Sequence, residues 1–194
     1  MQKNRLEAFS DGVLAIIITI MVLELKVPRG ADWWSLAALL PVFSGYVLSF
    51  LYVGIYWNNH HHLLQTVHHV SAGILWANLH LLFWLSLLPF ATAWVGQNFL
   101  APAPLAFYGA VLLMSAIAYF TLQRAIVSHQ GDGSLLAAAL GADWKGKLSP
   151  LAYIAAIPLG YVNGWIAVAL YCGVALLWVV PDRRIERTLR QTER

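Results

Sequence analysis

The sequence predicts an all-α integral membrane protein with six transmembrane helices and with both termini in the cytoplasm. Three observations predict this class. First, 60% of the 194 residues are hydrophobic and only 11% are charged, whereas about a quarter of the residues of soluble proteins are charged. Second, six apolar segments follow one another along the chain. Third, most lysines and arginines fall on one side of the membrane that these segments imply.

The first four apolar segments are long enough for membrane helices, which need about 20 residues each. The first ends near Lys26 and Pro28, and the second is entered through Trp33 and Trp34. The last two are short, and we expect them to tilt little or to lie in a locally thin membrane. The stretch 133–144, GSLLAAALGADW, is too short to cross and is predicted as an interfacial or capping helix. The six helices are expected at residues 9–27, 36–57, 72–94, 104–126, 148–162 and 165–180, in one transmembrane domain over residues 1–194.

The distribution of basic residues predicts the orientation. Lysine and arginine are enriched in cytoplasmic loops, and an N-terminus inside places only Lys26 and Arg29 on the outer side. A cleaved signal peptide is the competing interpretation of the N-terminus, but Asp11 interrupts the approach to the apolar core and no A-x-A-like site follows it. The expected cytoplasmic basic residues are Lys3, Arg5, Arg124, Lys145, Lys147 and the five arginines after residue 181.

Several kinds of chemistry have no counterpart in the sequence. It contains no phosphate-binding glycine loop, no nucleophile elbow and no pair of cysteines, since Cys172 stands alone. The net charge of +3 does not indicate nucleic acid binding, because the basic residues cluster at the ends of apolar segments. We therefore expect neither an enzyme nor a resident cofactor or metal.

The histidines of NNHHHLLQTVHH are the most conspicuous polar cluster. Adjacent histidines on a helix point about 100° apart. The pairs His61–His68 and His62–His69 share a face but lie two turns, about 10 Å, apart, which is too far for one ion. A polar, partly hydrated helix end at the cytoplasmic surface is the preferred interpretation. A metal, haem or pH-sensing role is the alternative.

Polar residues at the start of the first segment, RLEAFSDGVLAIIITIMVLEL, need an explanation because lipid disfavours charge. On a helix, Phe9, Gly12, Ile16, Ile20 and Leu23 share one face, with Thr19 about 60° to its side, whereas Ser10 and Asp11 point elsewhere. Ionisable groups within a membrane normally have partners in the bundle interior. Two interpretations of Ser10 and Asp11 remain open. Their contacts with such partners either only fix the first helix in the bundle or also support the function of that helix. The expected partners are Arg5, His60, His61, Asn78 and His80.

Arg5, Phe9, Ser10 and Asp11 match the pattern R-x-x-x-F-S-D. With the apolar run that ends in LEL, they resemble the first helix of the transmembrane protein 175 family of potassium channels. YWNNHHHLLQ and WANLHLLFWLSLLPFATAW are more loosely similar. The resemblance implies a cation channel moderately selective for potassium, without the conventional filter TVGYG, a string that this sequence lacks. It also implies a pore lined by the first helix, and a homotetramer of six-helix subunits of the prokaryotic branch in the plasma membrane.

The resemblance gives the first helix a specific expected role. Four copies of Ile16, Ile20 and Leu23 would form stacked apolar rings, and narrow apolar rings close a pore by expelling water. Thr19, turned inward, would offer four oxygens to a partly dehydrated potassium ion. Without the resemblance, these residues are aliphatic side chains that face lipid or a core. A proton channel, a proton-coupled transporter, a membrane enzyme that uses the histidines and a purely structural membrane protein remain alternatives.

Overall fold

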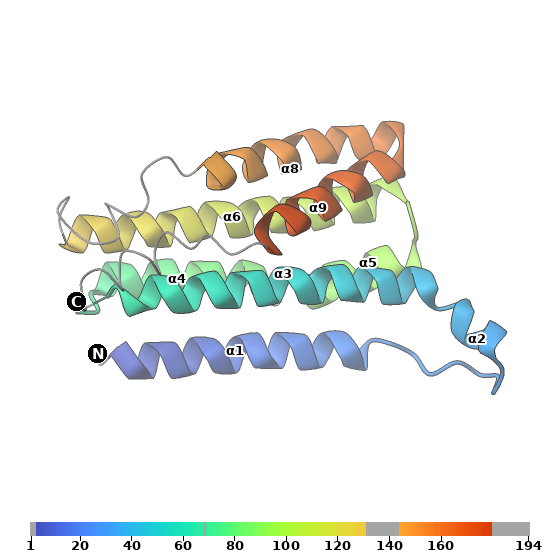
Figure 1. Cartoon of the computed structure of the whole chain (residues 1–194), viewed down its shortest axis with the longest axis horizontal. Helices are drawn as coiled ribbons and strands as arrows, with labels where there is room; N and C mark the ends of the chain where they lie inside the picture. The colour runs from blue at the N-terminus through green and yellow to red at the C-terminus, as the bar shows by residue number, and fades with distance from the viewer. Residues whose placement is uncertain (1–2, 68, 131–143, 180–194) are drawn as a thin grey trace.

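A computed structural model describes residues 3–67, 69–130 and 144–179, and these residues form helices joined by turns and short connections. The long helices run roughly side by side, with α1 and α8 on opposite sides of the bundle (Figure 1). Helix α1 packs against α3, α4 and α5, whereas α8 packs against α6 and α9. The helices are α1 Lys3–Leu23, α2 Trp33–Ala37, α3 Leu40–Gln65, α4 Ala72–Ser86, α5 Leu88–Gln97, α6 Pro102–Gln130, α8 Trp144–Val162 and α9 Gly164–Val179.

Four helical segments of the described chain are long and apolar enough to cross a membrane: Lys3–Leu23, Leu40–Gln65, Ala72–Gln97 and Pro102–Gln130. The third combines α4 and α5, which are separated at Leu87 just before Pro89. Proline at the start of a helix has no amide hydrogen to donate, so it suits this break. Helix α9 is apolar but shorter.

The predicted boundaries need correction at several ends. Helix α1 begins six residues earlier than expected, because Lys3 and Glu7 form an (i, i+4) ion pair of 3.8 Å on its first turns. The expected helix at 36–57 is replaced by the separate short helix α2 and by α3, which continues to Gln65. Helix α8 starts at Trp144 rather than at residue 148, and the helix expected at 133–144 lies outside the described residues apart from Trp144.

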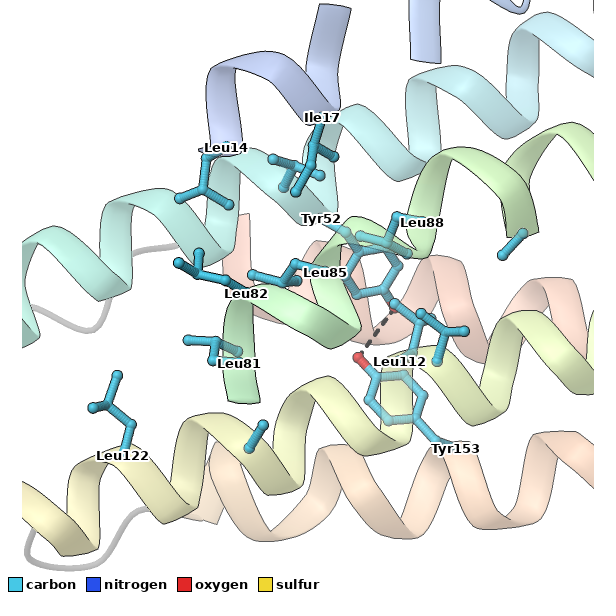
Figure 2. Close-up of a cluster of buried hydrophobic side chains, with 14 of the residues drawn as sticks. Leu14, Ile17, Tyr52, Leu81, Leu82, Leu85, Leu88, Leu112, Leu122 and Tyr153 are labelled. Carbon is cyan, nitrogen blue, oxygen red and sulfur yellow. Dashed lines mark hydrogen bonds between the residues drawn. The ribbon is translucent and has the colours of Figure 1, made fainter. Parts of the chain in front are cut away.

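The core fills the space between α1, α3, α4, α5, α6, α8 and α9. Leu14 and Ile17 of α1 face leucines of α4 and α5, while Leu112 and Leu122 lie on α6 (Figure 2). Tyr52 of α3 and Tyr153 of α8 join the two sides of the bundle, because the Tyr153 hydroxyl donates to the Tyr52 hydroxyl over 3.3 Å. This core holds α1 by one side only.

Candidate pore helix and its polar support

Helix α1 has one packed face and one uncovered face. The packed face consists of five buried residues at intervals of three or four, as helical geometry requires. On the other face Ile16 is 59% exposed and Leu23 is 75% exposed, and Phe9, Thr19 and Ile20 are exposed as well. The structure thus places all four predicted pore residues on the uncovered face. The buried residues are Leu6, Ser10, Leu14, Ile17 and Met21.

Ser10 lies at the centre of a buried hydrogen-bond chain that links α1, α4 and α3. The Nδ2 amide of Asn78 donates to Ser10 Oγ over 3.0 Å, and Ser10 Oγ donates to the Leu6 carbonyl over 2.9 Å. His60 Nε2 lies 2.7 Å from Asn78 Oδ1. An amide oxygen only accepts hydrogen bonds, so His60 carries its proton on Nε2. The structure therefore brings together Ser10 and two of its expected partners.

Asp11 lies at the edge of α1 rather than inside the bundle. Its carboxylate accepts a 3.0 Å hydrogen bond from Trp57 Nε1 and is exposed. Asp11 differs from the buried Ser10 in this respect, because residue 11 lies about 100° round the helix from residue 10. Trp57 is a site residue that the sequence interpretation missed. A tryptophan near the end of an apolar segment indicates an interfacial anchor. Its position in the sequence does not show that its Nε1 donates a hydrogen bond to Asp11.

The remaining expected partners lie apart from Ser10 and Asp11. Arg5 is exposed and makes no hydrogen bond or ion pair with the described residues. His61 stacks on the Trp57 ring, with centroids 6.3 Å apart, and its Nε2 lies 2.9 Å from Gln65 Nε2. His80 accepts from Trp84 Nε1 over 3.0 Å. Ser10 and Asp11 are therefore held by separate contacts, and not by one network among the residues that the structure describes.

Thr19 uses its hydroxyl within its own helix. Thr19 Oγ1 donates to the Ala15 carbonyl over 2.9 Å, although the residue lies on the uncovered face. The Thr19 hydroxyl is therefore exposed on the same face as Ile16 and Ile20, while its proton is bound by a carbonyl of the same helix.

The described histidines of NNHHHLLQTVHH have different surroundings. His60 is buried, His61 and His69 are exposed, and His62 Nδ1 is buried without a hydrogen-bond partner. His68 lies outside the described residues. Among the residues that the structure describes, no group of three or more histidine, cysteine or acidic side chains is close enough to hold a metal ion.

Together, these features define an all-helical membrane protein whose first helix is anchored on its polar side and uncovered on its apolar side. The sequence profile of the family described as "Endosomal/lysosomal potassium channel TMEM175" matches residues 5–89. A potassium channel of Chryseobacterium sp. (strain P1-3) is 56% identical over 191 residues, 98% of this chain and 100% of that protein. The chain belongs to the TMEM175 family, a family of ion channels.

Further proteins are similar in sequence or structure to most or part of this chain. A potassium channel of Streptomyces collinus is 31% identical over 91% of both chains. The crystal structure of a lysosomal potassium-selective channel TMEM175 homolog from Chamaesiphon minutus matches with a TM-score of 0.81 at 26% identity, over 93% of this chain and 97% of that one. The human endosomal/lysosomal proton channel TMEM175 is 38% identical over 79 residues, 34% of this chain and 16% of that protein.

Proposed function

We propose that this chain is the subunit of a potassium-conducting channel in which four copies place α1 around a central axis. The observation that carries the proposal is the uncovered apolar face of α1, with Ile16 and Leu23 more than half exposed. The uncovered side of such a helix faces either lipid or another copy of the chain, and closed rings of identical subunits are the usual arrangement of homo-oligomers. The bacterial relatives named potassium channels support potassium as the permeating ion.

The proposed constriction consists of rings of Ile16, Ile20 and Leu23. These side chains lie on successive turns of one face, so four copies of each residue form stacked apolar rings. A narrow apolar ring is a barrier because water leaves it readily. Thr19 adds the only hydroxyl at this level, and we assign it the contact with a partly dehydrated potassium ion after rotation away from the Ala15 carbonyl. Potassium is the transported ion in this scheme and is not a resident cofactor.

We further propose six membrane crossings in one domain over residues 1–194, with both termini in the cytoplasm of a prokaryotic cell and the protein in its plasma membrane. Helices α8 and α9 have 19 and 16 residues, or about 28 and 24 Å at 1.5 Å per residue. These lengths approach the hydrocarbon thickness of about 30 Å. The orientation is inferred from basic residues on the two sides of the membrane. Lys145 and Lys147 lie at the start of α8, and Lys26 and Arg29 follow α1.

Proton conduction or proton-coupled transport is the second candidate function. The animal relatives that match part of this chain are named proton channels. Asp11 and the buried His60 supply ionisable groups next to α1, as a proton path requires. A coupled transporter would show saturable flux that depends on the proton gradient, whereas a channel would show single-channel steps.

Single-channel recording of the purified chain in a planar bilayer tests the proposal. We expect discrete currents whose reversal potential follows the potassium gradient more closely than the sodium gradient. A reversal potential that follows the pH gradient would show that protons, and not potassium ions, are the permeating species. Absence of current from protein that is folded and correctly inserted would overturn the channel proposal.

A further inference from the structure

An open cleft lies between α1 and α5 at the end of the bundle where α2 projects (Figure 1). Its volume, measured for the centre of a water molecule, is about 440 Å³. One water molecule occupies about 10–15 Å³ on that measure, so the cleft has room for many. Ile20 and Glu24 form its wall on one side, and Phe90, Trp94 and Gln97 of α5 form the other. Because Ile20 also belongs to the proposed constriction, the cleft borders the proposed pore.

Glu24 continues the helical turn beyond the last residue of α1. Its backbone amide donates to the Ile20 carbonyl over 3.2 Å. Four residues of an α-helix advance about 6 Å and rotate about 40° beyond one full turn, so Glu24 lies one turn past Ile20 on nearly the same side. It directly follows Leu23, and it is exposed. The carboxylate of Glu24 therefore lies just beyond the outermost proposed apolar ring.

The cleft presents a negative charge to the water in it. The Glu24 carboxylate forms no ion pair or hydrogen bond with any residue that the structure describes. Among the described residues that line the cleft, none is a lysine, arginine or histidine. Lys26 lines instead a cavity between α1, α3 and α5, which Glu24 also borders. Of the other charged residues after α1, Arg29 is exposed, and Asp32 binds Ser35 at the start of α2.

We propose that Glu24 raises the concentration of potassium and other cations at the outer end of the pore. The inference rests on the proposed tetramer, because one central axis brings four copies of the carboxylate to the same mouth. Acidic side chains around a cation pore favour the entry of cations, and a cleft lined by one sign of charge increases the local concentration of counter-ions. The ions remain hydrated in the open cleft, so Glu24 acts through its electric field rather than as a ligand.

Single-channel conductance at low and at high potassium tests the inference, with the channel in zwitterionic phosphatidylcholine. We expect Glu24→Gln to lower the conductance about threefold at about 10 mM potassium, because the local concentration of cations falls. At about 1 M potassium the conductance is expected to equal that of the unmodified chain, since the Debye length is then only about 3 Å. Lys26→Gln is the matched control, because it removes a nearby charge that does not border the cleft. Its conductance at low potassium is not expected to fall.

Equal conductance of Glu24→Gln and the unmodified chain at both concentrations would overturn the inference. A fall by the same factor at both concentrations would also overturn it, because that result indicates a changed pore shape and not a lost charge. An equal fall in Lys26→Gln at low potassium would exclude a specific effect of Glu24. Absence of current from the unmodified chain would instead contradict the channel proposal on which the inference rests.

Glu24→Cys in a Cys172→Ala background provides a second test if Glu24→Gln does not assemble. A thiol reagent that attaches a sulfonate restores the negative charge, so we expect it to raise the conductance at low potassium. A reagent that attaches a quaternary ammonium adds a positive charge and should lower this conductance. Equal effects of the two reagents would contradict a role for the charge.

Discussion

Ser10 shows how one small polar side chain anchors α1 in the bundle. It is fully buried, receives a hydrogen bond from Asn78, and through Asn78 is connected to His60 on α3. A buried donor without a partner costs about 1–3 kcal/mol. The strength of the anchor therefore depends more on Asn78, which contacts both Ser10 and His60, than on the exposed Asp11.

We expect Asn78→Leu to lower stability by about 1–3 kcal/mol, because His60 Nε2 loses its acceptor in a buried position. Asp11→Ala is expected to cost less, since Asp11 is exposed and exposed substitutions usually change stability by about 0.5 kcal/mol or less. Fluorescence-detected size-exclusion yield and unfolding temperature in detergent compare the two. A loss in Asp11→Ala equal to that in Asn78→Leu would show that Asp11 is buried between subunits.

We expect Ile16→Asn to raise resting potassium conductance several-fold and to weaken discrimination against sodium, because a polar ring stays hydrated. Single-channel recording and flux into vesicles measure both effects. Ile154→Asn on α8 is the control, because Ile154 is 53% exposed and lies on a helix far from α1. Normal currents in correctly assembled Ile16→Asn and Leu23→Asn channels would place the pore elsewhere.

At the scale of elements, close contacts between helices depend on small residues at the crossing points. A Cβ atom on Gly109 of α6 would fall on the Tyr171 hydroxyl of α9 and would lie 3.1 Å from Ile157 Cγ1 of α8. The Tyr171 hydroxyl donates to the Leu105 carbonyl, and the Tyr171 carbonyl accepts from Tyr52. Three helices therefore meet tightly at Gly109.

We expect Gly109→Ala to destabilise the chain by about 1–3 kcal/mol, the usual cost of overpacking. Gly173→Ala is the matched control, because a Cβ there meets nothing within 4 Å. Alanine is also the better helix former, by about 1 kcal/mol. Gly173→Ala should therefore leave the unfolding temperature unchanged or raise it. An unchanged unfolding temperature in Gly109→Ala would show that Tyr171 moves at little cost.

Helix α2 is held at its start by Asp32, which accepts hydrogen bonds from the backbone amide and hydroxyl of Ser35, each 2.9 Å long. These hydrogen bonds lower the pKa of Asp32 below its ordinary value of 3.8. The cap therefore stabilises α2 fully above pH 3.8 and is lost as the pH falls through the lowered pKa. We expect the fluorescence of Trp33 and Trp34 to change in that acidic range, and Asp32→Asn to reduce this dependence. A transition near neutral pH would contradict this assignment.

At the scale of the whole molecule, the uncovered face of α1 predicts assembly. We expect a homotetramer of about 86 kDa, four times the 21.5 kDa chain. Mass measurement in mild detergent tests the number of subunits. In a Cys172→Ala background, Ile16→Cys should form cross-links between subunits, whereas Ile154→Cys on α8 should not. A monomer or dimer with full ion flux would contradict the assembly and its central axis.

The sequence by itself determined the helical membrane class, the family and the face of α1 that carries Ile16, Ile20 and Leu23. These properties follow from apolar segment length, local spacing and a contiguous motif, and each depends on residues close together in the chain. Helix ends were less well predicted, because polar contacts outside the apolar runs, such as the Lys3–Glu7 ion pair and the Asp32 cap, accompany helical turns that hydropathy does not indicate.

Only the tertiary structure decided which distant side chains meet. Ser10 lies 68 residues from Asn78, and Asp11 lies 46 residues from Trp57. Such pairings depend on the packing and rotation of whole helices, which hydropathy does not encode. The cleft beside Glu24 has the same origin, because its walls come from α1, α4 and α5, and no single segment reveals the space between them.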